Sequence, residues 1–307
     1  MPGPLRRRYA ATVPLVLALT ALVVAGCGDD DDKDKSSKAP DEPTKATTMS
    51  ITTTDIGKKQ FKMEAPKSIE GGLVTVNFRN ASKVKHEAQL IRLDGGHTVK
   101  EVLKIVSVEK PVIPDWFQAE GGVAGTEPGQ TGTATVKLPP GDYAVIDTES
   151  GDMEGPPPSA FGATANFKVT GDNGGVFKDT PAKIAVKDKG HHEYEWVTSN
   201  LKAGKTELTF DNTKSKEIHL VVGFPILGNA TIADVRKFLS QRGKPSGPPP
   251  VDFEKGFNTA VLDGKRKETT TVTLVKGRNA LVCFLHDRDG KGKPHTEEGL
   301  LKEVEVQ

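Results

Sequence analysis

Residues 281–301 read LVCFLHDRDGKGKPHTEEGLL. This stretch holds Cys283, which is followed by His286 and His295, and the only other cysteine of the chain is Cys27. The stretch therefore places one unpaired thiol close to two imidazoles, which makes it a candidate functional site. The competing interpretation is that Cys283 lies inert in the apolar strand 280–285, because a free cysteine is often buried.

The chain contains one long pattern twice. The segment that begins at Gly72 aligns with the segment that begins at Gly204, and a later segment around Asp147 aligns with the one around Cys283. A repeat of this length indicates a duplicated domain and not a short solenoid repeat. The aligned pairs are Gly72 and Gly204, Phe78 and Phe210, Asn80 and Asn212, His86 and His219, Gly141 and Gly277, and Asp147 and Cys283.

Apolar and polar residues alternate in both copies. A period of two with Val, Thr and Phe enriched predicts half-buried β-strands. Glycine, proline, asparagine and aspartate separate these runs at positions typical of turns. The clearest alternating runs are residues 73–78, 133–138, 270–274 and 301–306.

Each copy also contains one short segment with helical spacing. Residues 231–239 have this spacing with Thr231 as the expected N-cap, and residues 98–104 are their counterpart. We therefore predict an all-β protein with two tandem Greek-key β-sandwich domains, each with a short helix in a long connection. The first copy is expected over residues 48–172 and the second copy over residues 181–307.

The second copy resembles a cupredoxin, the blue-copper fold. Cupredoxins take one copper-binding histidine from the loop after an F-x-N strand, and a cysteine, a second histidine and usually a methionine from one late loop. Here residues 210–212 read FDN and precede His219, and Cys283 begins the late loop. The family's P-G-x-Y segment before the cysteine is kept in the first copy as residues 140–143, PGDY. The resemblance implies a cupredoxin-like fold.

The same resemblance implies one copper ion bound by His219, Cys283 and a second imidazole. His295 stands five residues before Leu300, which matches the family's His-to-Met spacing, and we favour it. His286 stands three residues after Cys283, the C-x-x-H spacing of plastocyanin, and is the alternative. Leu300 takes the axial position, which fits either a tuned site or a site that has lost its ion. A copper site requires the Cys283 sulfur within about 6 Å of the imidazoles.

The first copy has lost most of this pattern. It keeps the first histidine as His86. At the aligned positions, Asp147 replaces the cysteine, Pro158 the second histidine and Ala163 the methionine. One imidazole does not hold copper, so the first copy is expected to be structural or an interaction module. A metal role for His86 with Asp147 is not favoured, and neither is one for the pair 191–192, HH, which opens a predicted strand.

The N-terminus predicts export and lipidation. Residues 6–8 are arginines, an apolar run covers residues 10–24, and residues 24–27, VAGC, resemble the lipobox of bacterial lipoproteins. Residues 1–27 are therefore expected to be a lipoprotein signal peptide with Cys27 acylated, and residues 28–47 a flexible acidic tether. This places the protein on the extracytoplasmic side of the cell membrane, held by a lipid anchor.

Composition and motifs narrow the function. A net charge of +1 with mixed signs gives no basic face for nucleic acid. The G-x-S-x-G elbow, the phosphate-binding glycine loop and H-E-x-x-H are absent, so we expect no enzyme. We predict one-electron transfer or copper handling, with the membrane and a redox or copper-donor protein as partners. The alternative is a metal-free β-sandwich binding or scaffold lipoprotein.

Overall fold

The computed structural model describes residues 46–108, 110–149, 156–241 and 247–307, and they belong to one compact unit. The predicted signal peptide 1–27 with Cys27, and nearly all of the predicted tether, lie outside the described residues. Within the described part, no helix has the length and apolar character needed to cross a membrane.

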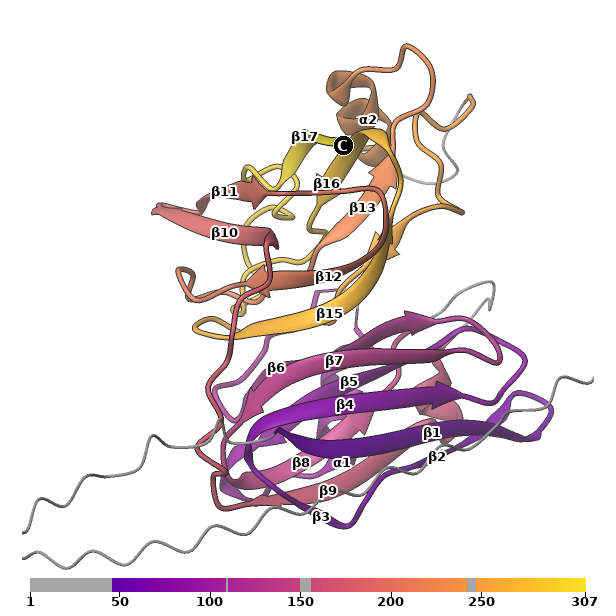
Figure 1. Ribbon diagram of the computed structural model, residues 1–307, viewed down its shortest axis with the longest axis vertical. Helices are drawn as coiled ribbons and strands as arrows, with labels where there is room; N and C mark the ends of the chain where they lie inside the picture. The colour runs from indigo at the N-terminus through magenta and orange to yellow at the C-terminus, as the bar shows by residue number, and fades with distance from the viewer. Residues whose placement is uncertain (1–45, 109, 150–155, 242–246) are drawn as a thin grey trace, which may run out of the picture. The chain divides into compact units, whose positions relative to one another are not determined.

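The first copy is a sandwich of two sheets (Figure 1). One sheet runs in the order β2-β1-β4-β7 and the other in the order β3-β9-β8-β5-β6. The strands are β1 (Thr47–Gly57), β2 (Gln60–Glu64), β3 (Ser68–Glu70), β4 (Gly72–Asn80), β5 (His86–Leu93), β6 (Phe117–Thr126), β7 (Thr131–Leu138), β8 (Gly141–Ile146) and β9 (Thr164–Thr170). Helix α1 (Val99–Val106) lies in the connection between β5 and β6, and two 3-10 turns cover Asp94–Gly96 and Pro158–Phe161.

The second copy repeats this arrangement. One sheet runs β11-β10-β12-β15 and the other β14-β13-β16-β17. The strands are β10 (Ala182–Gly190), β11 (Glu193–Ser199), β12 (Gly204–Asp211), β13 (Val222–Pro225), β14 (Phe257–Asn258), β15 (Lys267–Leu274), β16 (Gly277–Val282) and β17 (Leu301–Val306). Helix α2 (Ile232–Leu239) lies between β13 and β14.

The two copies share their strand pairings as well as their strand order. The first strand of each copy forms an antiparallel hairpin with the next strand and pairs in parallel with a later one, β1 with β4 and β10 with β12. Both helices begin after a threonine with an acidic residue three positions later, Thr98 with Glu101 and Thr231 with Asp234. These pairs form capping boxes that satisfy the free N–H groups of the first turn. The predicted all-β class with one short helix in each copy is confirmed.

Each sandwich buries the side chains that alternate inward from its two sheets. In the first copy Val74, Val76 and Phe78 of β4 face Tyr143 and Val145 of β8. The core of the second copy contains Trp196, Phe210, Cys283 and Leu300 among its buried residues. The period of two in the sequence thus reflects one face of each strand packed against the opposite sheet.

The two copies are joined along one sheet edge. Strand β15 pairs with β7 in antiparallel register, with Glu268 opposite Val136 and Thr270 opposite Ala134. This pairing merges one sheet of each copy into a single eight-stranded sheet, visible in Figure 1 where β15 runs beside β7. It also covers two sheet edges that would otherwise present unpaired backbone groups.

Buried polar contacts reinforce this junction. Glu120 of β6 is 1% exposed and accepts hydrogen bonds from Arg92 of its own copy, at 2.9 Å, and from Arg266 of the second copy, at 2.5 and 3.2 Å. The Gln89 side chain exchanges hydrogen bonds with the backbone of Val261, at 2.7 and 3.1 Å. Because these groups are buried and paired, separating the copies would leave charges and amides without partners.

Candidate metal centre

Three predicted ligands meet in the core of the second copy. The Sγ of Cys283 lies 3.9 Å from Nδ1 of His219 and 3.5 Å from Nδ1 of His295. All three side chains are completely buried. Their ligand atoms lie within 4.8 Å of one another, although His219 lies far from the other two in the sequence.

His219 is placed by a network around Asn212, the asparagine of the F-x-N pattern. The Asn212 side chain donates hydrogen bonds to the carbonyls of Glu217, Leu262 and Asp263, at 2.8 to 3.0 Å. The backbone of His219 in turn exchanges two hydrogen bonds with Leu262, at 2.8 and 2.9 Å. The asparagine therefore ties together the two segments between which His219 is held.

Cys283 and His295 lie in one loop, residues 283–300, which we call the ligand loop. Strand β16 ends at Val282, so Cys283 follows the strand and does not lie inside it as predicted. The N–H of Cys283 donates to the carbonyl of Leu300 at 3.0 Å, and the N–H of Leu300 donates to the carbonyl of His295 at 2.8 Å. These bonds close the loop and bring its ends to the same point.

Further side chains orient the imidazoles. Nε2 of His219 lies 3.0 Å from Oγ of Ser215, and Nε2 of His295 lies 3.1 Å from Oδ1 of Asp287. The Tyr194 ring packs against both imidazoles, with ring centroids 4.9 and 5.0 Å apart, and its hydroxyl donates to Asp287 at 2.9 Å. A carboxylate that accepts the Nε2 proton of His295 leaves Nδ1 with a free lone pair, as a metal ligand needs.

Burial sets the protonation of the three ligands. It lowers the pKa of His219 well below its usual range, and the neighbouring charge of His295 acts in the same direction. It also lowers the pKa of His295, although Asp287 opposes the shift. Burial raises the pKa of the Cys283 thiol to about 12. At neutral pH the metal-free centre therefore holds two neutral imidazoles and a protonated thiol, and binding of an ion releases the thiol proton.

The spacing of the three donors fits a first-row transition metal. With the zinc bond lengths of about 2.3 Å to sulfur and about 2.0 Å to nitrogen, a trigonal arrangement separates the sulfur from each nitrogen by about 3.7 Å. The two observed distances, 3.9 and 3.5 Å, lie on either side of that value. The requirement that the sulfur lie within about 6 Å of the imidazoles is met. Two imidazoles and one thiolate are the ligand set of mononuclear blue-copper sites.

The other two predicted positions differ from each other. Leu300 is completely buried and packs in the same core cluster as Cys283. His286 is only partly buried and is not part of the group of side chains around Cys283. The structure thus places His295, and not His286, beside the sulfur.

The corresponding place in the first copy holds a histidine–aspartate pair. Nδ1 of His86 contacts Oδ2 of Asp147, and both side chains are completely buried. Ala163 donates its N–H to the carbonyl of Pro158 at 3.1 Å, the same contact that Leu300 makes with His295. Among the described residues of the first copy, no three metal-ligating side chains come together. The carboxylate of Asp147 has replaced the thiolate as the partner of the imidazole.

Sequence reasoning missed several residues around the centre. Ser215 is an ordinary loop residue in the sequence. Tyr194 is an ordinary strand residue that alternates with Trp196, as a buried strand residue should. Asp287 was not recognised as the partner of His295. The structure also gathers His192, Asp287 and Glu298 into a second group of metal-ligating side chains next to the first.

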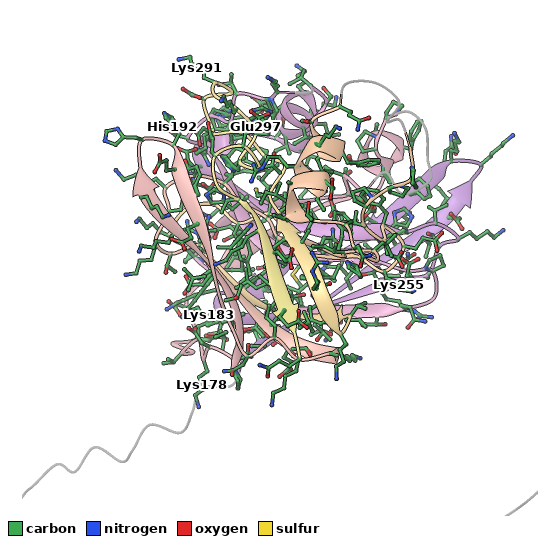
Figure 2. All side chains as sticks on the ribbon, turned by 90° about the horizontal axis from the view of Figure 1, so that it is seen from above. Lys178, Lys183, His192, Lys255, Lys291 and Glu297 are labelled. Carbon is green, nitrogen blue, oxygen red and sulfur yellow. The ribbon has the colours of Figure 1, made fainter. Side chains whose placement is uncertain are left out.

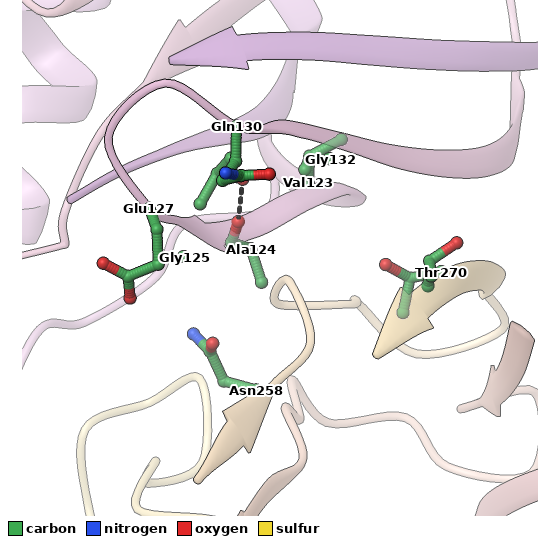
Figure 3. A pocket seen from close by; sticks show the side chains of 10 residues that line it. Val123, Ala124, Gly125, Glu127, Gln130, Gly132, Asn258 and Thr270 are labelled. Carbon is green, nitrogen blue, oxygen red and sulfur yellow. Dashed lines mark hydrogen bonds between the residues drawn. The ribbon is translucent and has the colours of Figure 1, made fainter. Parts of the chain in front are cut away.

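Two other hollows carry no comparable set of ligands. The one in Figure 3 has a volume of about 210 Å³, lies between the β6–β7 turn and residues Asn258 and Thr270, and has Glu127 as the one ionisable residue of its lining. A second hollow of about 200 Å³ is apolar and is lined in part by Ile91, Ile218 and Leu285. Neither combines the soft donors that a copper ion requires.

Comparisons with known proteins give similar structures only. No family model matches the sequence, and no curated protein matches it. A multicopper oxidase structure is similar at 15% identity, covering 85% of this chain and 88% of that chain, with a TM-score of 0.23. Dithionite-reduced auracyanin from Roseiflexus castenholzii is similar at 19% identity, covering 41% of this chain and 99% of that chain, with a TM-score of 0.27. Structures of copper proteins are thus among those to which this chain is similar.

These comparisons correct one expectation. Copper nitrite reductase from Nitrosomonas europaea is also similar, at 14% identity with a TM-score of 0.23, covering 85% of this chain and 94% of that chain. It and the multicopper oxidase are enzymes, whereas the sequence led us to exclude an enzyme. These matches contradict that expectation, which is therefore withdrawn.

Proposed function

We propose that the second copy binds one copper ion through Nδ1 of His219, Sγ of Cys283 and Nδ1 of His295, and that the protein serves one-electron transfer or copper handling. The observation that carries this proposal is the convergence of the three buried donors at 3.5 and 3.9 Å. Copper in such a set supplies a one-electron couple between its cupric and cuprous forms.

The surrounding residues supply a rigid and dry environment for that couple. Ser215 and Asp287 fix the orientation of the two imidazoles, and Tyr194 packs against both rings. Leu300, buried in the same core as Cys283, would stand at the axial position of a bound copper ion and offers no donor atom. Because the axial ligand tunes the potential, a centre with leucine there is expected to be a stronger oxidant than one with methionine.

The test of binding is copper content after equilibrium dialysis of the purified full-length chain. We expect about one tightly bound equivalent in the wild type and a loss of at least about tenfold in the affinity for that equivalent in His295→Ala, with His286→Ala as the matched control. Equal retention of copper by His295→Ala and the wild type would contradict the proposed ligand set. A wild type that binds no copper would support the metal-free scaffold instead.

The proposal extends to the location of the protein and its domains. Cys27, in the lipobox-like residues 24–27, is proposed as the acylated anchor that holds residues 48–172 and 181–307, as two domains, at the extracytoplasmic side of the cell membrane. A redox protein or a copper donor would be the partner there. Cys27→Ser should release the protein from the membrane fraction, and retention of the variant on the membrane would count against the anchor.

A further inference from the structure

A second group of potential ligands lies beside the proposed copper site. It consists of His192 in the turn between β10 and β11, and of Asp287 and Glu298 in the ligand loop. One ligand atom from each lies within 4.8 Å of the other two. We call this group the outer cluster.

The backbone holds the outer cluster together. The N–H of Tyr194 donates to the carbonyl of Glu298 at 2.8 Å. Gly299 lies so close to this strand that a Cβ on it would meet the carbonyl oxygen of Tyr194 at 2.0 Å. With a φ of +108°, Gly299 also has a conformation that favours glycine. The β10–β11 turn is therefore fixed against the ligand loop.

One oxygen of the outer cluster lacks a partner. Oε1 of Glu298 accepts the N–H of Lys293 at 3.1 Å, but Oε2 is buried without a hydrogen-bond partner in the part of the chain that the structure describes. A buried carboxylate oxygen without a partner is costly, and a bound cation would remove that cost. The nearby ammonium group of Lys293 lies 3.9 Å from a different carboxylate, Glu297.

The outer cluster opens to solvent through His192, whereas the inner ligands are completely buried. The His192 side chain is 64% exposed and borders a hollow of about 570 Å³ whose lining includes Glu297 and Glu298. Figure 2 shows His192 and Glu297 toward the same side of the molecule as Lys291. One imidazole nitrogen and two carboxylate oxygens suit a divalent first-row ion, and among these Cu²⁺ binds most tightly to such donors.

Asp287 connects the two groups. Its Oδ2 contacts Nδ1 of His192, while its Oδ1 lies 3.1 Å from Nε2 of the inner ligand His295. A single carboxylate therefore touches both an exposed and a completely buried imidazole. An ion bound at the outer cluster would be separated from the inner ligand His295 by the Asp287 carboxylate alone.

We infer that His192, Asp287 and Glu298 form an outer Cu²⁺ site that loads the buried centre. In the transfer the ion exchanges the nitrogen and oxygen donors of the outer cluster for His219, Cys283 and His295. Its oxidation state does not change, and the thiol of Cys283 loses one proton to water. The loading role rests on the proposed copper function, but the outer site itself does not.

The outer site is tested with the inner one disabled. In the full-length chain carrying His219→Ala and Cys283→Ala, we expect one Cu²⁺ with an electron paramagnetic resonance signal typical of nitrogen and oxygen ligands. Adding His192→Ala should weaken this binding at least about tenfold. Adding His191→Ala, the neighbouring exposed imidazole outside the cluster, should not. Equal effects of the two substitutions, or no Cu²⁺ bound, would overturn the outer site.

The loading role is tested with the inner ligands intact. After Cu²⁺ is mixed with the metal-free full-length chain, the thiolate-to-copper absorption should appear at least about tenfold more slowly in His192→Ala and Glu298→Gln than in the wild type. His191→Ala and Glu297→Gln are the matched controls and should keep the wild-type rate. Equal rates in all five proteins would overturn the loading role. Absence of the absorption in every protein would instead count against the inner copper site, and with it the loading role.

Discussion

Arg288 fastens the ligand loop to the first copy, and its removal should be costly. Its Nη1 donates to Oδ2 of Asp263 at 2.5 Å, and its Nη2 donates to the carbonyls of Pro114 and Phe117 at 2.7 and 2.9 Å. The side chains of Arg288 and Asp263 are only 15% and 6% exposed. In Arg288→Ala, the Asp263 carboxylate and two carbonyls would lose their cationic partner.

The size of the effect follows from this burial. Removing one partner of a buried ion pair costs about 3–5 kcal/mol. Asp263 keeps hydrogen bonds from the N–H groups of Ala119 and Gly264, at 3.1 Å each, so part of its charge stays satisfied. We therefore expect Arg288→Ala to lower the free energy of unfolding by about 2–4 kcal/mol. The free energy of unfolding of Arg288→Lys should lie between those of Arg288→Ala and the wild type, because an ammonium group cannot reproduce the forked contacts of the guanidinium.

The assay is urea unfolding followed by the fluorescence of Trp116 and Trp196, one in each copy. The matched control is Arg278→Ala, since Arg278 pairs with Glu303 at 2.7 Å where both side chains are more than a third exposed, 37% and 35%. Such an exposed pair contributes about 1 kcal/mol or less. A loss in Arg288→Ala no larger than in Arg278→Ala would refute the idea that Arg288 secures the ligand loop.

Three further predictions concern the junction and the centre. Burial raises the pKa of Glu268 to about 8. The contribution of its protonated form to the free energy of unfolding is therefore complete below about pH 4.5 and is lost as the pH rises toward 8. In urea unfolding between pH 5 and 8, the free energy of unfolding of Glu268→Gln relative to the wild type should therefore rise by up to about 1.4 kcal/mol per pH unit. A difference between the two proteins that does not change with pH would contradict this. Leu300→Met should lower the reduction potential of the copper-loaded protein in redox titration, and a potential unchanged or raised would argue against Leu300 as the axial position. His295→Ala should abolish the thiolate-to-copper absorption while His286→Ala keeps it, and the reverse result would exchange their roles.

The fold was largely readable because its signals are local. Strand β4, for example, buries alternate side chains, so a period of two survives in the sequence. The helix after Thr231 was predicted because threonine is a preferred N-cap residue. In the structure the N–H of Asp234 donates to the Thr231 hydroxyl at 3.2 Å. The pairing of β15 with β7 was not predicted, because an edge strand that meets the other copy has the same alternation as any other strand.

The centre was readable in its ligands but not in its surroundings. The family spacing pointed to His219, Cys283 and His295. By contrast, Asp287 contacts Tyr194 and His192, which lie 93 and 95 positions away in the sequence. Only the packing of the β10–β11 turn against the ligand loop brings these groups together. A metal role for the pair 191–192 was not favoured because the pair opens a predicted strand. The carboxylates that meet His192 in the structure, Asp287 and Glu298, lie at the far end of the chain.

The central claim is that His219, Cys283 and His295 hold one copper ion. The most direct measurement is a Cu²⁺ titration of the full-length chain followed by visible absorption. We predict an intense thiolate-to-copper band that saturates near one equivalent and is absent in Cys283→Ala. A wild type that stays colourless, or a band that persists in Cys283→Ala, would contradict the claim.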